Sequence, residues 1–589
     1  MKNLVYILVD ALSYDNVGAR EYRNSPTPFL DELKSKSLSF ENMYTQAPYT
    51  EAAFVSTLCG ENVLDNGGYI WGLEKCERSY ASVLKEKNFC TLSTLSPYIM
   101  SKSYIKNVDT YVYSRTYSLA PLKLYRLGYF REKYLNHTMT AREYEICERL
   151  LDDALEVLLD QLESLQNNGE ETVLIQNLVD NKDEVPSILQ TVRKQRELYL
   201  RDKIAYLQEI FEQWDTQELL KNTKLSMVKK VSADTKRYIE ENYGEFLHEV
   251  QKKENSLMKK NQKYDWKYIL DLACNDEQKY RGAIHTYRKY KELYENTLII
   301  DGINGAVEEK VTISAERQLQ FFAEKIIGLD QQKQNYFAFI HLEDFHLPSM
   351  YYSYDENSRN VIDRDFKRLE EFVKTIPDNY KGSLVADMSA FYVDNAIRNF
   401  FNTLSEQTKN EFVFVVTADH GYPCNYNPPR PIIFNAFYQE NYHIPLVIYD
   451  SSKPEKRVEN GLFSSMDIMD ILFDMIDEKE EQLIERPYVL IEYPGPGCPV
   501  ISSKEIYYAI FDGKYKVAVK AKLAERVDES KVVLVTDVES DAEERRNLIR
   551  KIKKLKQVQK LIEIVDARHV EIANKFGGEK FYKHILGED

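Results

Sequence analysis

Three groups of residues in this sequence have side chains suited to metal-assisted chemistry. Asp10 follows one apolar run, Thr50 lies in a polar segment, and Asp419-His420-Gly421 follows a second apolar run. Two carboxylates and an imidazole are enough to bind a divalent cation such as Mn²⁺, Zn²⁺ or Mg²⁺. A threonine hydroxyl is a weak nucleophile at neutral pH, and a metal ion is one of the few ways to activate it.

Each of these residues also has a purely structural interpretation. An aspartate after a strand often stabilises a turn, and most threonines only support the fold. An Asp-His-Gly tripeptide is as compatible with a turn as with a metal site, because glycine lets the backbone turn away from a strand end. Only the order of these residues and the segments around them can distinguish the functional interpretation from the structural one.

Further candidates for contact with a substrate come later in the chain. His346 could bind the transferred group or protonate a leaving oxygen. Asp344 could act beside it, as an additional ligand or as a supporting partner. His443 precedes an apolar run and could contact substrate. His341 lies within an apolar run, and we interpret it as structural.

The elements that must position these residues are strands alternating with helices. Apolar runs typical of buried parallel strands lie at 4–9, 337–341, 412–417 and 444–449. Helix-period patterns lie between them, at 28–36, 80–87 and 388–404. This order predicts an α/β, mostly parallel sheet covered by helices on both faces. Functional residues in such sheets gather beyond the carboxyl ends of the strands, where the candidates fall.

The pattern divides the chain into three parts. Residues 1–125 and 331–486 form the predicted catalytic α/β domain, and 126–330 a helical insertion. The insertion has a heptad-like leucine seam (151, 155, 158, 162 and 165). It could pack on itself or on the sheet domain, or it could form a dimerisation arm or a lid over the site. Residues 487–589 predict a small antiparallel sheet followed by a charged helical tail from about residue 542.

Composition narrows the class of protein. The chain of 589 residues has a net charge of −16, which disfavours nucleic acid as a partner. Its seven cysteines are scattered and show no metal-binding spacing, which fits a reducing compartment. No run has the length of a membrane span, and the N-terminal run is too short for a signal peptide. We therefore expect a cytoplasmic protein.

An ordered series of motifs resembles the sulfatase branch of the alkaline phosphatase superfamily. The opening at 8–18 resembles the family's first-strand motif. Residues 27–33 and 40–48 are similar to the segments before its nucleophile, and Gly60 follows Thr50 at the family's spacing. Further similar segments follow in the family's order, at 341–348, 392–397, 418–421, 443–448, 465–472 and 532–548. The resemblance covers about residues 1–120 and 335–550.

Departures from the sulfatase pattern determine the expected chemistry. Sulfatases have a cysteine or serine that matures to an aldehyde hydrate, followed by a proline and an arginine, whereas this chain has Thr50, Ala52 and Phe54. Threonine cannot form that aldehyde because its carbinol carbon bears a methyl group. The paired acids of the first motif are reduced to Asp10 and Ala11, and the sulfate-binding lysine and histidine are replaced by a segment at 96–98.

A threonine nucleophile with one carboxylate and an Asp-His pair is similar to the superfamily's phosphoglycerol and phosphoethanolamine transferases and phosphodiesterases. The resemblance implies that Asp10, Thr50, Asp419 and His420 hold one divalent metal ion (Mn, Zn, Mg or Ca). It implies a small-molecule or glycan phosphoester substrate, related to glycans or to the cell envelope. A sulfatase and a catalytically silent scaffold remain as alternatives, and a homo-oligomer formed through the insertion stays open.

Overall fold

The structure is a computed structural model. It describes residues 1–20, 24–96, 102–114, 126–167, 182–221, 237–250, 313–345, 359–377, 384–421, 438–494, 505–542 and 546–576, with isolated positions at 234, 252, 253, 256, 380 and 544. Among the described residues, no helix combines the length and the apolar content that crossing a membrane requires.

The described residues form a large mixed sheet of nine strands, in the order β4-β3-β5-β1-β6-β7-β2-β8, with β9 beside β2. Its parallel half runs from β4 to β6, whereas β7 pairs antiparallel with both β6 and β2. This confirms the predicted α/β, mostly parallel sheet. The strands are β1 (Asn3–Val9), β2 (Leu38–Tyr44), β3 (Cys90–Leu95), β4 (Thr110–Tyr113), β5 (Tyr336–Leu342), β6 (Phe412–Thr417), β7 (His443–Asp450), β8 (Arg457–Glu459) and β9 (Phe463–Ser464).

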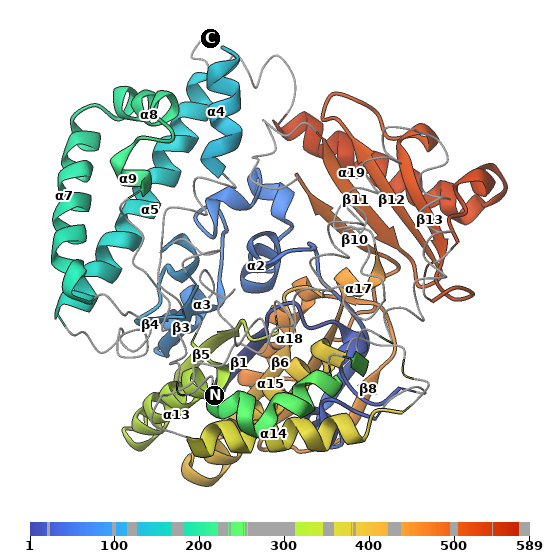
Figure 1. Cartoon of the computed structure of the whole chain (residues 1–589). Helices are drawn as coiled ribbons and strands as arrows, with labels where there is room; N and C mark the ends of the chain where they lie inside the picture. The colour runs from blue at the N-terminus through green and yellow to red at the C-terminus, as the bar shows by residue number, and fades with distance from the viewer. Residues whose placement is uncertain are drawn as a thin grey trace.

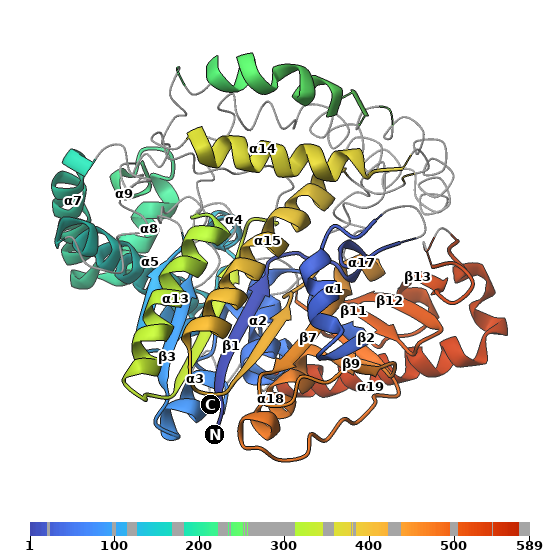
Figure 2. The ribbon, with the colours of Figure 1, turned by 90° about the horizontal axis from the view of Figure 1, so that it is seen from below.

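The central strand is β1, and it is buried from end to end between β5 and β6. Its run of apolar, mostly branched residues suits a strand covered on both faces. Helices cover the two faces of the sheet (Figure 2). One face carries α1 (Pro28–Lys34), α13 (Ala315–Gln331) and α15 (Leu384–Gln407). The other carries α2 (Thr50–Cys59), α3 (Tyr80–Glu86) and α18 (Ile468–Ile476).

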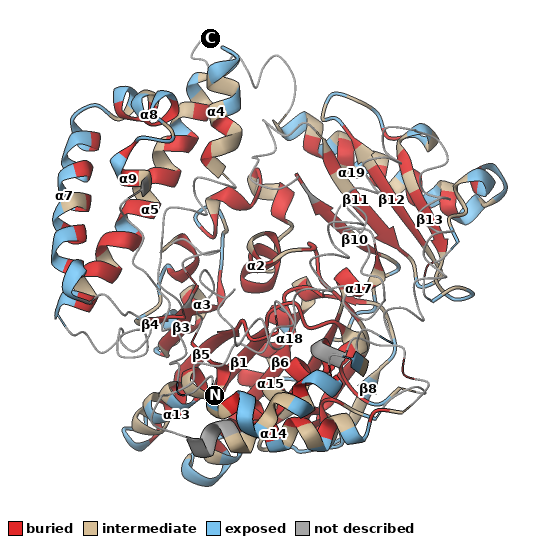
Figure 3. Ribbon diagram, viewed as in Figure 1, coloured by how far each residue is buried: buried red, intermediate tan, exposed pale blue. Residues whose placement is uncertain are grey.

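Helices from the middle of the chain pack beside this sheet (Figure 1). The leucine seam lies on α5 (Ala141–Asn167), where all five leucines are buried. It packs against α7 (Val185–Arg201) and α8 (Lys203–Glu212), while α7 turns an exposed face outward (Figure 3). The leucine seam therefore packs against other helices of the same insertion. The described residues also include the helices α4 (Gly128–Leu135), α9 (Glu218–Lys221) and α14 (Arg359–Lys374), and a helical segment over 237–250.

A second sheet of four antiparallel strands is found in the described C-terminal part, as predicted. It comprises β10 (Val489–Tyr493), β11 (Ile506–Phe511), β12 (Tyr515–Ala521) and β13 (Val532–Asp537). The helix α19 (Lys556–Phe576) packs on β11 and β12. Helical structure in this tail begins at Ile549, later than the expected position near 542, and turns at residues 538–540 follow β13. The three-part division into domains stays a prediction.

Candidate active site

Three neighbouring strands place the candidate residues on one face of the sheet. Leu8 of β1 pairs with His341 of β5 and with Thr417 of β6. Side chains alternate along a strand, so residues two positions apart share a face. Asp10 and Asp419 each lie two residues beyond this row, on the same face as His341. The ring of Phe54, on α2, lies 5.1 Å from the His341 ring, so this is the face that α2 covers.

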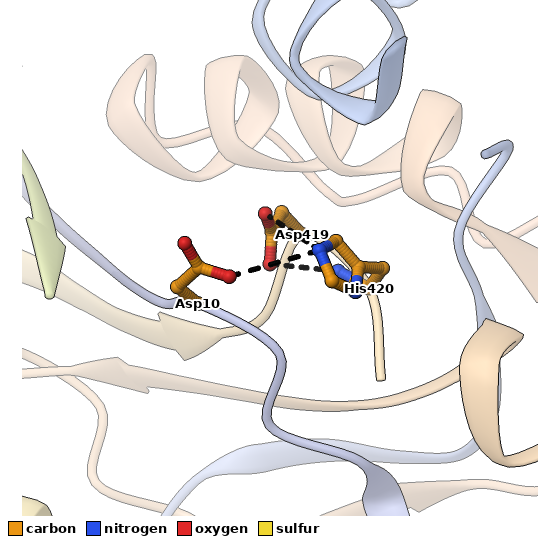
Figure 4. Close-up of side chains that lie close together, drawn as sticks. All are labelled: Asp10, Asp419 and His420. Atoms are coloured by element: carbon orange, nitrogen blue, oxygen red, sulfur yellow. Dashed lines mark hydrogen bonds and ion pairs between the residues drawn. The ribbon is translucent and has the colours of Figure 1, made fainter. Parts of the chain in front are cut away.

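Asp10, Asp419 and His420 converge into a compact cluster (Figure 4). One ligand atom from each lies within 4.8 Å of the others, and all three residues are buried. The His420 Nε2 atom is 3.6 Å from Asp10 Oδ1 and 3.6 Å from Asp419 Oδ2. Two carboxylate oxygens and an imidazole nitrogen form a donor set that suits a divalent cation of hard or intermediate character.

The tautomer of His420 follows from a contact with the main chain. Its Nδ1 atom lies 2.8 Å from the Gly421 carbonyl oxygen. Because a carbonyl oxygen only accepts hydrogen bonds, Nδ1 carries the hydrogen in the neutral ring, and Nε2 presents a lone pair. The Nε2 atom lies on the side of the ring that is near the Asp10 and Asp419 carboxylates. A hydrogen bond to the other ring nitrogen is the usual way in which a metal-binding histidine is oriented.

Asp419 uses its two oxygens differently. Oδ1 accepts hydrogen bonds from the Ala11 N–H at 3.0 Å and from the His420 N–H at 2.8 Å. Oδ2 is buried and has no hydrogen-bond partner among the described residues. Burial, followed by the negative charge of Asp10, raises the pKa of Asp419 above its usual range. A cation between the two carboxylates would relieve this repulsion and satisfy Oδ2, so the residues fit a divalent metal ion.

The backbone beside the cluster is strained. Ala11 has a φ of +65°, in the left-handed region that residues with a Cβ atom rarely adopt. This conformation lets its N–H reach Asp419 across the end of the sheet. Strain of this kind persists where the surrounding structure enforces it, and it is concentrated at functional sites.

Thr50 is the first residue of α2, and it is 4% exposed. Its Oγ1 atom lies 3.2 Å from His420 Nε2, which places the hydroxyl beside the cluster. The preceding residue, Tyr49, provides no side-chain cap for the first N–H groups of the helix. An uncapped helix start favours an anionic group, because its N–H groups and the helix dipole both point outward. The neighbouring acidic residue, Glu51, forms an ion pair with Arg126 at 2.6 Å. Its carboxylate is therefore engaged by Arg126.

His341, which we interpreted as structural from the sequence, contacts the cluster. Its side chain is completely buried, and its Nε2 atom is 3.3 Å from Asp10 Oδ2. The contact depends on the register between β1 and β5, which the sequence does not reveal. The available signal was its position at the carboxyl end of an otherwise apolar run.

The structure places the other two described substrate-contact candidates outside the cluster. Asp344 is buried on the opposite face, where Oδ1 accepts a hydrogen bond from the Ala315 N–H at 3.0 Å. Burial raises its pKa to about 7. His443 stacks between Tyr14 and Tyr44, and burial lowers its pKa to about 4. His346 lies outside the described residues. The roles of all three in substrate binding stay predictions.

The described residues thus form an α/β fold in which a buried acid–histidine cluster lies beside a threonine at a helix start. The sequence profile named Sulfatase matches residues 2–178 and 229–477, which is most of the chain. The chain therefore belongs to the sulfatase family, as a sulfatase-like hydrolase acting on phosphoryl or sulfuryl esters. Among curated protein sequences, none is close enough to this chain to count as a match.

Solved structures with similar folds include two phosphonate monoester hydrolases. The one from Silicibacter pomeroyi is 13% identical, with 97% of this chain and 96% of that chain covered at a TM-score of 0.48. The one from Agrobacterium radiobacter is 12% identical over 97% and 96%, at a TM-score of 0.47. A protein of the alkaline phosphatase superfamily from Vibrio parahaemolyticus is 12% identical over 95% and 88%, at a TM-score of 0.43.

Proposed function

We propose that the protein is a metal-dependent phosphotransferase or phosphodiesterase in which Thr50 is the nucleophile. The observation that carries this proposal is the 3.2 Å separation of Thr50 Oγ1 and His420 Nε2, at the uncapped start of α2. We further propose a glycan- or envelope-related phosphoester as substrate. His346, Asp344 and His443 are the proposed contacts to its remaining parts.

The proposed metal ligands are Asp10, Thr50, Asp419 and His420, for one Mn, Zn, Mg or Ca ion. A divalent ion at this position lowers the pKa of a bound hydroxyl and stabilises negative charge on the oxygens of a phosphoryl group. The protein contributes a buried, preorganised donor set. Because the three acid and histidine side chains already converge, little reorganisation is needed at the moment of reaction.

The proposed reaction has two displacements. In the first, Thr50 Oγ1 gives up its proton and attacks phosphorus in line, the bond from phosphorus to the leaving oxygen breaks, and the leaving oxygen takes up one proton. In the second, water or an acceptor hydroxyl attacks phosphorus, the bond to Oγ1 breaks, and Thr50 regains its proton. The N–H groups at the start of α2 would stabilise the charge on the non-bridging oxygens throughout.

A sulfuric ester hydrolase is the second candidate, and membership of the sulfatase family favours it. Against it stands the residue type at position 50. A threonine side chain cannot supply the aldehyde hydrate that sulfatases use, whereas it can form a phosphate ester directly. For localisation, we propose the cytoplasm on the basis of the scattered cysteines, and a homo-oligomer through the insertion stays a proposal.

The test compares three nitrophenyl esters, a phosphodiester, a phosphomonoester and a sulfate, with Mn²⁺, Zn²⁺ or Mg²⁺ added. We expect metal-dependent turnover of the phosphodiester. Thr50→Ala should reduce turnover by at least ~10³-fold, whereas Thr50→Ser, which keeps a hydroxyl, should retain part of it. Thermal unfolding of both variants checks the fold. Full activity in Thr50→Ala would refute the nucleophile, and turnover of the sulfate ester alone would favour the sulfatase.

A further inference from the structure

His341 is an unusual residue for its surroundings. The strand β5 is buried throughout, and its other residues are apolar or aromatic. The imidazole is 0% exposed, and neither ring nitrogen forms a hydrogen bond within the described part of the chain. Burying an unsatisfied polar group costs about 1–3 kcal/mol. A leucine or phenylalanine would avoid that cost, so the fold alone gives no reason for a histidine at this position.

The His341 ring lies close to a polar atom of the acid–histidine cluster. Nε2 lies 3.3 Å from Asp10 Oδ2, while the other oxygen of Asp10, Oδ1, lies 3.6 Å from His420 Nε2. Asp10 therefore turns one oxygen toward His341 and the other toward the cluster. Asp419 shows the same division, since Oδ1 is held by main-chain N–H groups and Oδ2 points to the cluster.

The orientation of the His341 ring is fixed from the side of α2. The ring of Phe54 meets it edge to face, with centroids 5.1 Å apart and an interplanar angle of 79°. Phe54 lies on the helix that begins with Thr50. One helix therefore carries both the proposed nucleophile and the aromatic ring that orients His341.

We propose that His341 is a positioning residue. Its Nε2 atom, 3.3 Å from Asp10 Oδ2, donates a hydrogen bond to that oxygen when the metal ion binds, and thereby directs Oδ1 toward the ion. His341 is not a ligand, since the convergent set within 4.8 Å consists of Asp10, Asp419 and His420. Residues that orient ligands in this way typically contribute 10- to 100-fold to metal affinity. This inference rests on the metal site of the proposed function, and not on the phosphoryl chemistry.

The experiment measures binding of Mn²⁺ and Zn²⁺ to the full chain by calorimetry, after removal of metal with a chelator. His341→Leu should lower the affinity about 10- to 100-fold. It should leave the melting temperature of the metal-free protein unchanged or higher, because it removes a buried unsatisfied group. His341→Gln keeps an N–H donor and should recover most of the affinity.

The matched control is His569→Leu, which removes another buried histidine, one that contacts Tyr508 in the C-terminal part. It should leave metal affinity unchanged. Wild-type affinity in His341→Leu would overturn the inference alone. A loss of metal-free stability in His341→Leu that accounts for its loss of affinity would do the same, and would assign His341 a structural role. Absence of metal binding by the wild-type chain would overturn both this inference and the proposed function.

Discussion

Asp344 is a buried carboxylate whose ionisation depends on folding. One of its oxygens accepts the Ala315 N–H, and the other has no hydrogen-bond partner among the described residues. Because burial raises its pKa to about 7, the side chain is mostly protonated in the folded protein below pH 7. Its counterpart in the unfolded chain ionises near pH 4.

This difference in pKa predicts a pH-dependent stability. Between about pH 4 and pH 7 the unfolded chain gives up a proton that the folded chain retains, so Asp344 lowers stability by about 1.4 kcal/mol per pH unit. Above pH 7 both states are ionised and the loss levels off. Asp344→Asn should therefore match the wild type near pH 4 and exceed it by a few kcal/mol at pH 8. Urea unfolding at both values measures this, and a gap that does not widen with pH would contradict it.

The residues of the cluster differ in how far the sequence could identify them. Asp10 and Asp419 follow continuous apolar runs, so their position at strand ends was predictable. Their proximity was expected only because strand ends share an edge of a parallel sheet. The contact between His341 and Asp10 was not predictable, since it requires the pairing of Leu8 with His341. The metal and catalytic roles themselves stay predictions.

At the scale of elements, the segment after β6 is fixed by a close approach of two backbones. Gly421 donates its N–H to the Asn441 carbonyl, beside the short helix α17 (Gln439–Tyr442). A Cβ atom on Gly421 would lie 1.8 Å from the Glu440 carbonyl oxygen. Glycine is therefore required here by lack of space, and its φ lies outside the left-handed region.

Gly421→Ala should accordingly displace the adjacent His420. We expect a loss of about 1–3 kcal/mol in unfolding free energy, together with weaker metal binding, because overpacking forces the backbone to move. The matched control is Gly328→Ala in α13, where an added Cβ meets nothing within 4 Å. This variant should gain roughly 0.5–1 kcal/mol from helix propensity. Chemical denaturation measures the unfolding free energy of both variants. Equal changes in the two variants would contradict the steric argument.

The elements found from the sequence are those whose pattern is unambiguous. β1, β5, β6 and β7 are continuous apolar runs. By contrast, β2 contains Glu41 and Asn42, and only the family resemblance indicated it. The strand β4 has only four residues and was not predicted. Helical structure between residues 185 and 212 is interrupted at one residue. Asp202 has extended backbone angles, and its side chain accepts the Ala205 N–H at 3.0 Å, so one helix ends at Arg201 and another begins at Lys203.

At the scale of the whole molecule, a buried ion pair joins the C-terminal helix to the rest. Arg568 of α19 donates to both oxygens of Glu492 on β10, and to Asp65 at 2.7 Å. Asp65 belongs to η2 (Val63–Asn66), in the segment that follows α2. Glu492 is 0% exposed. Three distant parts of the chain therefore meet at one guanidinium group.

Removing this arginine should be costly. In Arg568→Met the buried Glu492 carboxylate loses its partner, and we expect a loss of about 3–5 kcal/mol in unfolding free energy. Adding Glu492→Gln removes the uncompensated charge and should restore most of the stability. Guanidinium unfolding of the single and double variants measures both steps. A loss below about 1 kcal/mol in Arg568→Met would contradict the assigned role.

The central position of β1 has a consequence for synthesis. Its two neighbours, β5 and β6, lie more than 320 and 400 residues later in the chain. At roughly 5–20 residues per second, a ribosome needs about 20–80 s to supply β6 after β1 has emerged. During that interval this buried strand has no partner on either side, and the cluster around Asp10 is incomplete. We therefore expect nascent chains that end before residue 412 to depend on chaperones, and metal to be acquired only late in synthesis.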